Sequence, residues 1–230
     1  MIMGTLMSES RSVFVLIKSE EESSLGRWNP SVDLASVTCS LYPEHQRASS
    51  RLTPLSVDLP KSMVERDFAW TWYSECLIRP SLGEKLKNSG LTGFYTRKAH
   101  VTHKGVAFPN GFDELFAVGW GGIADPRSGV RLIESCPACG MLSYSGVTNW
   151  NQLVDWNQWD GSDIFMVWPL PRFIFMTERG AQILTASRLT GAQIIAVTEL
   201  DPQEDLSPGR LSYWLPAEII SKLKISPEIA

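Results

Sequence analysis

The residues with the clearest potential for chemistry are Cys136 and Cys139, which stand in the sequence Cys-Pro-Ala-Cys-Gly. A Cys-x-x-Cys-Gly turn holds two thiolates on one side of a tight loop, as a zinc knuckle does. A closed zinc site needs two further ligands. We predict that His100 and His103, in the sequence Ala-His-Val-Thr-His, supply them. This ligand set would hold one structural zinc ion as the cofactor.

Other interpretations of the two cysteines stay open. Cys39 and Cys76 are alternative donors, and the turn could also be buried without any metal. In a redox dithiol a helix follows the motif and lowers the pKa of one thiol, but Gly-Met-Leu-Ser-Tyr-Ser-Gly does not predict a helix. A zinc deaminase is excluded, because its motif needs His-x-Glu and a proline at the position of Ser135.

The rest of the sequence offers few residues for catalysis. It contains no nucleophile elbow, no phosphate-binding loop and no His-Glu-x-x-His. The glycine-rich segment 119–122 precedes no predicted helix, so we do not expect it to bind phosphate. Three histidines leave few candidates for a general base. We therefore expect a protein that is not an enzyme, with a small zinc-dependent or dithiol redox enzyme as the alternative.

A tryptophan-rich segment at 149–163 is the best candidate for binding a partner. It contains three tryptophans and three aspartates, and the candidate contact residues are Trp150, Trp156, Trp159, Asp155 and Asp160. Tryptophan is favoured at interface hot spots, although it is also a large residue that is usually buried. We predict that this segment presents an aromatic and acidic face to a basic partner, with burial in the core as the alternative.

Composition narrows the functional class. The chain has 230 residues, of which 43% are hydrophobic and 20% charged, and its net charge is −4. These values are typical of a globular protein, and they give no basic surface for nucleic acid. No apolar run reaches the roughly 20 residues that cross a bilayer, and the N-terminus does not resemble a secretory signal. We therefore expect a cytoplasmic protein whose four cysteines are reduced or bind metal.

The sequence contains an internal repeat. Residues 70–93 align without a gap on residues 168–191, and both segments end in Leu-Thr-Gly. Each predicts a strand, a short helix and a second strand, which gives repeat units over about 67–98 and 165–198. Ser81 and Glu84 predict a capping box for the first helix, and Thr177 predicts the N-cap of the second.

The remaining elements complete the predicted fold. Alternating residues at 114–120 and the returning segment 130–134 predict a central hairpin with turns between them. Few regular elements are expected over 26–60. We predict an α+β fold, with a mixed, mainly antiparallel sheet and few short helices, and two echoing strand–helix–strand units around the central hairpin. A disordered tail over 1–11 and a single domain over 12–230 are expected.

Several of these motifs occur together in one protein family. The order Gly119–Gly122, Val130–Gly140, Trp159–Phe165 and Phe175–Gly191 resembles bacterial immunity-type proteins with a double Cys-x-x-Cys-Gly motif, which are linked to contact-delivered toxins in myxobacteria. The resemblance implies a cytoplasmic protein without enzymatic activity that binds and neutralises a cognate toxin. Only the second motif, Cys136 and Cys139, is present here. A structural or regulatory scaffold without a toxin partner is the least specific alternative.

Overall fold

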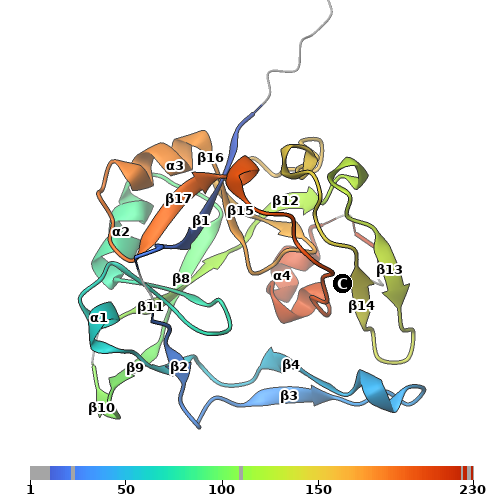
Figure 1. The fold of residues 1–230 in the computed structure, drawn as a ribbon, viewed down its shortest axis with the longest axis horizontal. Helices are drawn as coiled ribbons and strands as arrows, with labels where there is room; N and C mark the ends of the chain where they lie inside the picture. Colours follow the sequence, from blue (N-terminus) through green and yellow to red (C-terminus); the bar gives the residue numbers. More distant parts are fainter. Residues whose placement is uncertain (1–10, 22–23, 109–110, 224, 227–228, 230) are drawn as a thin grey trace, which may run out of the picture.

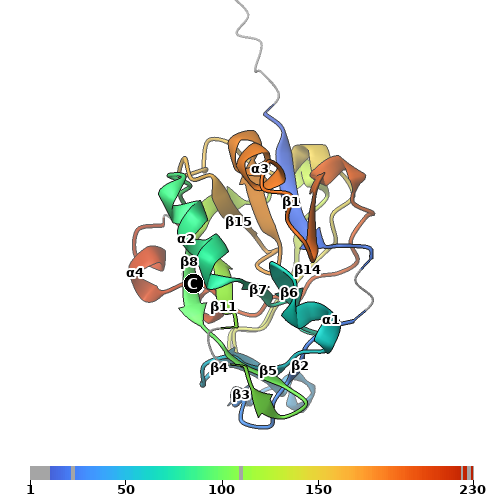
Figure 2. The same cartoon turned by 90° about the vertical axis from the view of Figure 1, so that its left-hand side faces the viewer.

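The α+β class predicted from the sequence is confirmed. A computed structural model describes residues 11–21, 24–108, 111–223, 225–226 and 229 (Figures 1 and 2). In these residues the α-helices are α1 (Lys61–Val64), α2 (Pro80–Asn88), α3 (Glu178–Thr185) and α4 (Ala217–Ile220). Short 3-10 helices lie at Pro43–His45, Pro126–Ser128, Trp150–Gln152, Val197–Glu199 and Leu211–Tyr213. The predicted tail lies outside the described residues except for Arg11.

The largest sheet has the order β12-β15-β16-β1-β17. Its strands are Gly119–Ile123, Ile164–Trp168, Ile174–Thr177, Val13–Lys18 and Ala192–Ala196. The strand pairs are antiparallel except β12 with β15, which is parallel. The first strand of the chain, β1, therefore lies in the middle of a sheet that is otherwise made by the second half of the chain.

A second sheet repeats this arrangement with the order β6-β7-β11-β8. Its strands are Phe68–Trp70, Cys76–Ile78, Asp113–Ala117 and Phe94–Lys98, and every pair is antiparallel. Here β11, from the start of the second half, lies between strands of the first half. Each half of the chain, residues 1–108 and 109–230, thus contains a hairpin, a helix, a Leu-Thr-Gly turn and a strand. The first strand of each half, β1 or β11, lies in the sheet of the other half.

The register of the strands supports this correspondence. Ile78 pairs with Asp113, which pairs with Lys98. At the corresponding positions Met176 pairs with Phe14, which pairs with Ala196. The gapless alignment needs one correction, because the β15–β16 hairpin is two residues longer than the β6–β7 hairpin. Trp70 consequently corresponds to Met166 in space and not to Trp168.

A reciprocal pair of aspartates joins the two halves. Asp163, just before β15, accepts hydrogen bonds from the backbone N–H of Thr92 (3.0 Å) and from its hydroxyl (3.1 Å). Asp67, just before β6, accepts the same two bonds from Thr190, at 2.9 and 2.8 Å. Each Leu-Thr-Gly turn is therefore fixed by the opposite half.

The glycine of each turn allows this close approach. A Cβ atom on Gly93 would lie 1.9 Å from the carbonyl oxygen of Ile164, and one on Gly191 would lie 2.2 Å from that of Phe68. Both glycines have a positive φ, which disfavours any other residue.

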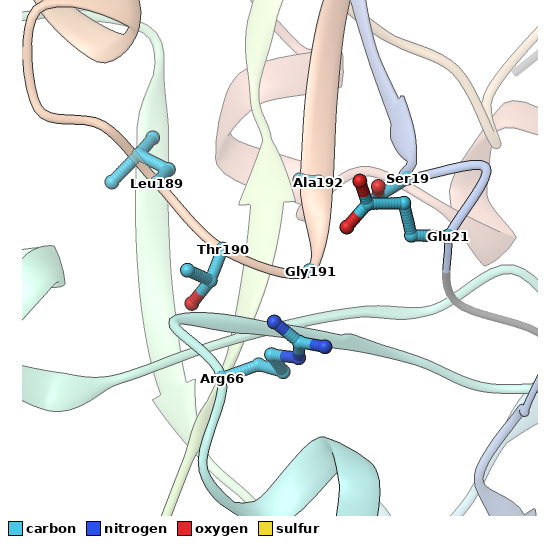
Figure 3. A pocket seen from close by; sticks show the side chains of 7 residues that line it. All are labelled: Ser19, Glu21, Arg66, Leu189, Thr190, Gly191 and Ala192. Atoms are coloured by element: carbon cyan, nitrogen blue, oxygen red, sulfur yellow. The ribbon is translucent and has the colours of Figure 1, made fainter.

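A pocket of about 100 Å³ lies beside the second turn, lined by Ser19, Glu21, Arg66 and residues 189–192 (Figure 3). It is smaller than the roughly 300 Å³ of typical ligand pockets.

The helices cover a core that both sheets share. α2 and α3 lie side by side (Figure 2) and pack Leu82, Leu86, Ala181 and Leu184 into one apolar cluster with both sheets. Thr177 caps α3 as predicted, because its hydroxyl accepts the N–H of Gly180. The capping box predicted for α2 is wrong. That helix begins at Pro80 without a side-chain cap, because the fixed φ of proline suits the first helical position.

The predicted central hairpin between segments 114–120 and 130–134 is wrong, because the two segments pair with other strands. The segment 114–120 divides between β11 and β12, which belong to different sheets. The break falls beside Gly119, where a Cβ atom would lie 2.0 Å from the hydroxyl of Ser162. The later segment forms β13 (Leu132–Ser135), and this strand pairs with β14 (Leu142–Tyr144).

The region 26–60 contains more regular structure than the sequence predicts. β3 (Leu34–Val37) and β4 (Arg47–Arg51) form a two-stranded sheet. A four-stranded sheet has the order β10-β9-β5-β2, with strands Val106–Ala107, His100–His103, Ser56–Asp58 and Arg27–Trp28. These strands have few residues and mixed polarity, so hydrophobic periodicity does not reveal them.

Candidate metal centre

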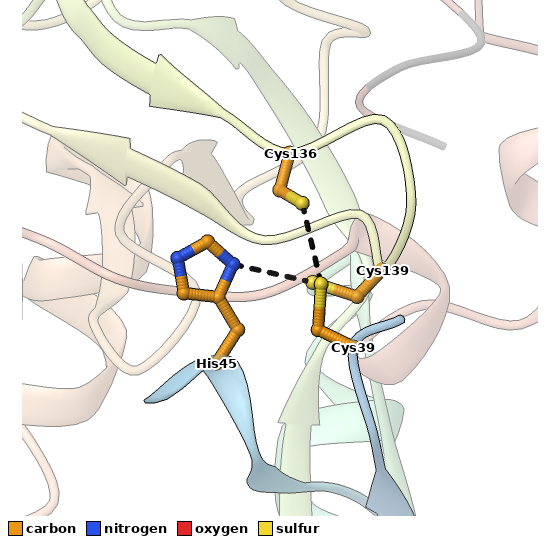
Figure 4. A group of neighbouring side chains, drawn as sticks. All are labelled: Cys39, His45, Cys136 and Cys139. Atoms are coloured by element: carbon orange, nitrogen blue, oxygen red, sulfur yellow. Dashed lines mark hydrogen bonds between the residues drawn. The ribbon is translucent and has the colours of Figure 1, made fainter. Parts of the chain in front are cut away.

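Three thiols and one imidazole meet between two hairpins. Cys39 and His45 lie on the connection from β3 to β4, and Cys136 and Cys139 lie on the connection from β13 to β14 (Figure 4). All four residues are buried, and their ligand atoms lie within 4.8 Å of one another. Figure 1 shows the tips of the two hairpins approaching each other at the edge of the molecule.

The distances fit a tetrahedral metal site. The sulfur atoms of Cys39 and Cys136 are 3.7 Å apart, and the sulfur of Cys139 is 3.7 Å from Nδ1 of His45. Zinc bonds of about 2.3 Å to sulfur and about 2.0 Å to nitrogen place tetrahedral ligands roughly 3.5–3.8 Å apart. Both measured distances fall in this range, so the four buried side chains form a cluster that could hold a metal ion.

The local backbone positions the Cys-x-x-Cys pair. The N–H of Cys136 donates to the carbonyl of Met141 (2.9 Å), and the N–H of Gly140 donates to the carbonyl of Cys136 (2.8 Å). Gly140 has a φ of 66°, which glycine adopts without strain. This tight turn places both thiols on the same side, as the Cys-x-x-Cys-Gly motif predicts.

Neighbouring groups support the ligands. Arg47 donates to the sulfur of Cys139 at 3.4 Å and to its carbonyl at 3.1 Å. The N–H of Tyr42 donates to the sulfur of Cys39 at 3.4 Å. Nε2 of His45 is 3.9 Å from a carboxylate oxygen of Glu134, the side of the ring where metal-binding histidines usually have a carboxylate or carbonyl partner.

The two thiols of the motif have different acidities. Burial raises the pKa of Cys136 above its ordinary value. Burial acts in the same direction on Cys139, but hydrogen bonds from Arg47, the Met141 backbone and His45 outweigh it and lower the pKa of this thiol to about 6. Cys139 is therefore largely a thiolate at neutral pH, which is the form that binds metal.

The histidines predicted as ligands do not lie with these cysteines. His100 and His103 belong to β9, where His100 is exposed and Nδ1 of His103 lies 2.8 Å from the carbonyl of Leu59. Cys76, an alternative donor, is fully buried in the core shared by the sheets. Cys39, the other alternative, does belong to the cluster.

His45 is the candidate ligand that the sequence analysis missed. A signal for it exists in the repeat, because Cys39 and Cys136 occupy similar hairpins in the two halves. A metal-binding side chain a few residues after Cys39 is therefore the expected equivalent of Cys139, which follows Cys136. In the first half Tyr42 stands at the Cys-x-x-Cys spacing from Cys39, and His45 lies one 3-10 turn further on.

The tryptophan-rich segment packs largely against the protein. Trp150 is buried and donates its indole N–H to the carbonyl of Asp201 (2.9 Å). Trp156 and Trp159 are half-buried, and both rings pack on Phe165. The guanidinium of Arg11 lies 5.3 Å from each of these two rings.

The carboxylates of this segment organise its turns. Asp155 accepts hydrogen bonds from Asn157 and Gln158, and Asp160 accepts them from Trp120 and Ser162. These hydrogen bonds fix the turns of the segment, and its role in binding a partner stays a prediction.

Comparisons with known proteins add no relative to this picture. No protein-family model matches the chain, and a search of curated proteins finds no significant match. Within the residues that the structure describes, no helix has the length and apolar character to span a bilayer.

Proposed function

We propose that the protein binds one structural zinc ion through Cys39, His45, Cys136 and Cys139. The observation that carries this proposal is the meeting of four buried donors from two hairpins that are far apart in sequence. Zinc would neutralise the thiolates and tie the β3–β4 hairpin to the β13–β14 hairpin. Four protein ligands leave no open position for a substrate, which favours a structural role over a catalytic one.

Metal analysis of the purified protein tests this proposal. We expect one zinc per chain, lost in Cys136→Ser and in His45→Ala. Cys76→Ala is the matched control, because this cysteine is buried outside the cluster, and it should keep its zinc. Wild-type protein without metal after expression in zinc-supplemented medium, or zinc kept by both ligand variants, would contradict the proposal.

We further propose that this zinc-stabilised scaffold is an immunity-type protein that acts in the cytoplasm and neutralises a cognate protein toxin by occlusion. The resemblance over residues 119–198 supports this role. A closed metal site, which stabilises a surface without reacting, is also suited to a binding protein. The alternative, a zinc or dithiol enzyme, would need a vacant coordination position or an accessible thiol, and all three thiols of the cluster are buried.

Co-expression with the small protein encoded beside it tests the biological role. The proposal predicts that the neighbour arrests growth, that this chain restores growth, and that the two proteins elute together as a one-to-one complex. A neighbour that arrests growth equally in the presence of this chain, without forming a complex, would rule out neutralisation.

A further inference from the structure

The two halves of the protein differ sharply at one set of equivalent positions. Across the largest sheet, one row of facing side chains is entirely apolar: Phe165, Phe175, Val15 and Ile195. The equivalent row in the second sheet contains two charges: Ala69, Leu77, Glu114 and Arg97. The first row is covered by the largest apolar cluster, whereas the charged part of the second row borders a groove.

Glu114 is the centre of a charged network on the floor of this groove. It is only 3% exposed and forms ion pairs with Arg51 and, at 3.0 Å, with Arg97. Arg51 also lies 3.7 Å from Glu75. Buried ion pairs contribute little to stability compared with apolar residues of similar size, and the other half uses apolar residues here. The network is therefore better explained by binding than by folding.

The groove has the size of a binding site. Its volume is about 760 Å³, and it lies between β4 on one side and residues 205–216 on the other. All five residues of β4 line it. Its aromatic residues include Trp28, Tyr73, Tyr95, Phe116 and Trp214.

The free edge of β4 indicates the form of the occupant. In the described residues β4 pairs only with β3. In the corresponding hairpin of the other half, the second edge of β14 is covered, because Tyr144 and Leu206 exchange two backbone hydrogen bonds of 2.8 Å. An extended chain therefore pairs with the second edge of β14, whereas in the described residues the second edge of β4 pairs with no strand. Strand addition is a common way to bind peptides.

Charge indicates the chemistry of the occupant. Four arginines and three acidic residues line the groove in a protein of net charge −4: Arg47, Arg51, Arg97, Arg172, Glu75, Glu114 and Asp205. Two of the carboxylates are already held by arginines. Arg97 is 45% exposed, and Arg172 is exposed and stacks over the ring of Trp214. Both guanidinium groups can still bind carboxylates.

We propose that this groove binds an extended acidic segment of a protein partner, which adds a strand to β4 and places carboxylates against Arg97 and Arg172. The inference deepens the proposed immunity function by naming the interface and the partner's chemistry. It is tested on the protein as purified and without the toxin, so its failure is separate from failure of neutralisation.

Labelled peptides test the groove directly. Fluorescein-labelled octapeptides of alternating Glu and Val are titrated with the protein, beside Lys–Val and Gln–Val peptides of the same length. The Glu–Val peptide should bind most tightly, and Arg172→Glu should weaken it at least about tenfold. Lys85→Glu, an exposed charge reversal on α2, should leave binding unchanged.

Hydrogen exchange separates strand addition from simple anion binding. The Glu–Val peptide should protect the amides of residues 47–51, and citrate at equal carboxylate concentration should not displace it. Absence of peptide binding, equal effects of the two charge reversals, or unprotected β4 amides would overturn the proposal. Displacement by citrate would overturn it too, and would indicate a site for small anions.

Discussion

At the scale of single residues, the cluster depends on a histidine that has no motif around it. The spacing of Cys136 and Cys139 identifies them as candidate ligands. His45 joins this cluster because the β3–β4 hairpin brings it to Cys139. His100 and His103 look more like a pair of ligands in the sequence, yet they lie on β9. This strand belongs to the sheet β10-β9-β5-β2, which contains neither of the two hairpins. Spacing therefore predicted half of the donor set, and tertiary structure decided the other half.

Arg47 offers a prediction about the strength of the metal site. Three thiolates and one neutral histidine around Zn²⁺ carry a net charge of −1, and the guanidinium of Arg47 lies against Cys139. Arg47→Met should lower zinc affinity by about 10–100-fold, the usual effect of removing a group that supports a ligand. Competition with a chromogenic chelator measures this. Affinity equal to that of the wild type would show that Arg47 does not stabilise the bound thiolates.

Asp163 offers a prediction about pH and stability. This carboxylate is buried, which by itself raises its pKa, but Arg179 and Thr92 outweigh burial and hold the pKa below its ordinary value. Such a group stabilises the fold above its unfolded pKa of about 3.9, and the contribution is lost as pH falls through the lower folded value.

Asp163→Asn should therefore destabilise the protein by about 1–3 kcal/mol at pH 7, measured by urea unfolding. The difference from the wild type should shrink at pH 3. Lys85→Glu serves as the control for a surface change of charge. A difference between Asp163→Asn and the wild type that stays constant from pH 7 to pH 3 would contradict the assignment of this carboxylate as the stabilising ion.

At the scale of elements, the candidate metal cluster joins the tips of the two hairpins. In the described residues, β3–β4 and β13–β14 are separate two-stranded sheets, and two strands alone are marginally stable in water. Removing zinc with a chelator should therefore speed amide exchange in residues 34–51 and 132–144, while β15, β16 and β1 keep their protection. Hydrogen exchange with mass spectrometry measures both regions. Equal loss of protection in all seven strands would indicate that the metal holds the whole fold.

Local signals predicted the elements of the repeat better than their pairing. Thr177 predicts the start of α3, and the β-branched run at 192–198 predicts β17. The exchange of β1 and β11 leaves no such signal, because strand partners are chosen by packing across the whole molecule. In the structure each exchanged strand faces residues of matching polarity, because Glu114 of β11 faces Arg97 and Val15 of β1 faces Ile195.

At the scale of the whole molecule, the exchange of first strands makes each sheet depend on both halves. β1 lies between β16 and β17, and β11 lies between β7 and β8. Each Leu-Thr-Gly turn also depends on an aspartate of the opposite half.

A split of the chain tests this dependence. Fragments 1–108 and 109–230 should associate tightly when expressed together and recover the circular dichroism spectrum of the intact chain. Either fragment alone should be unfolded or aggregated. Two fragments that fold independently as monomers and do not associate would contradict the exchange.

We propose that one zinc ion joins the two halves through three cysteines and His45. X-ray absorption at the zinc edge of the purified protein tests it most directly. We expect three sulfur neighbours at about 2.3 Å and one nitrogen at about 2.0 Å, and the same set of neighbours in His100→Ala. Two nitrogen neighbours that disappear when His100 and His103 are replaced, or an oxygen neighbour from bound water, would contradict it.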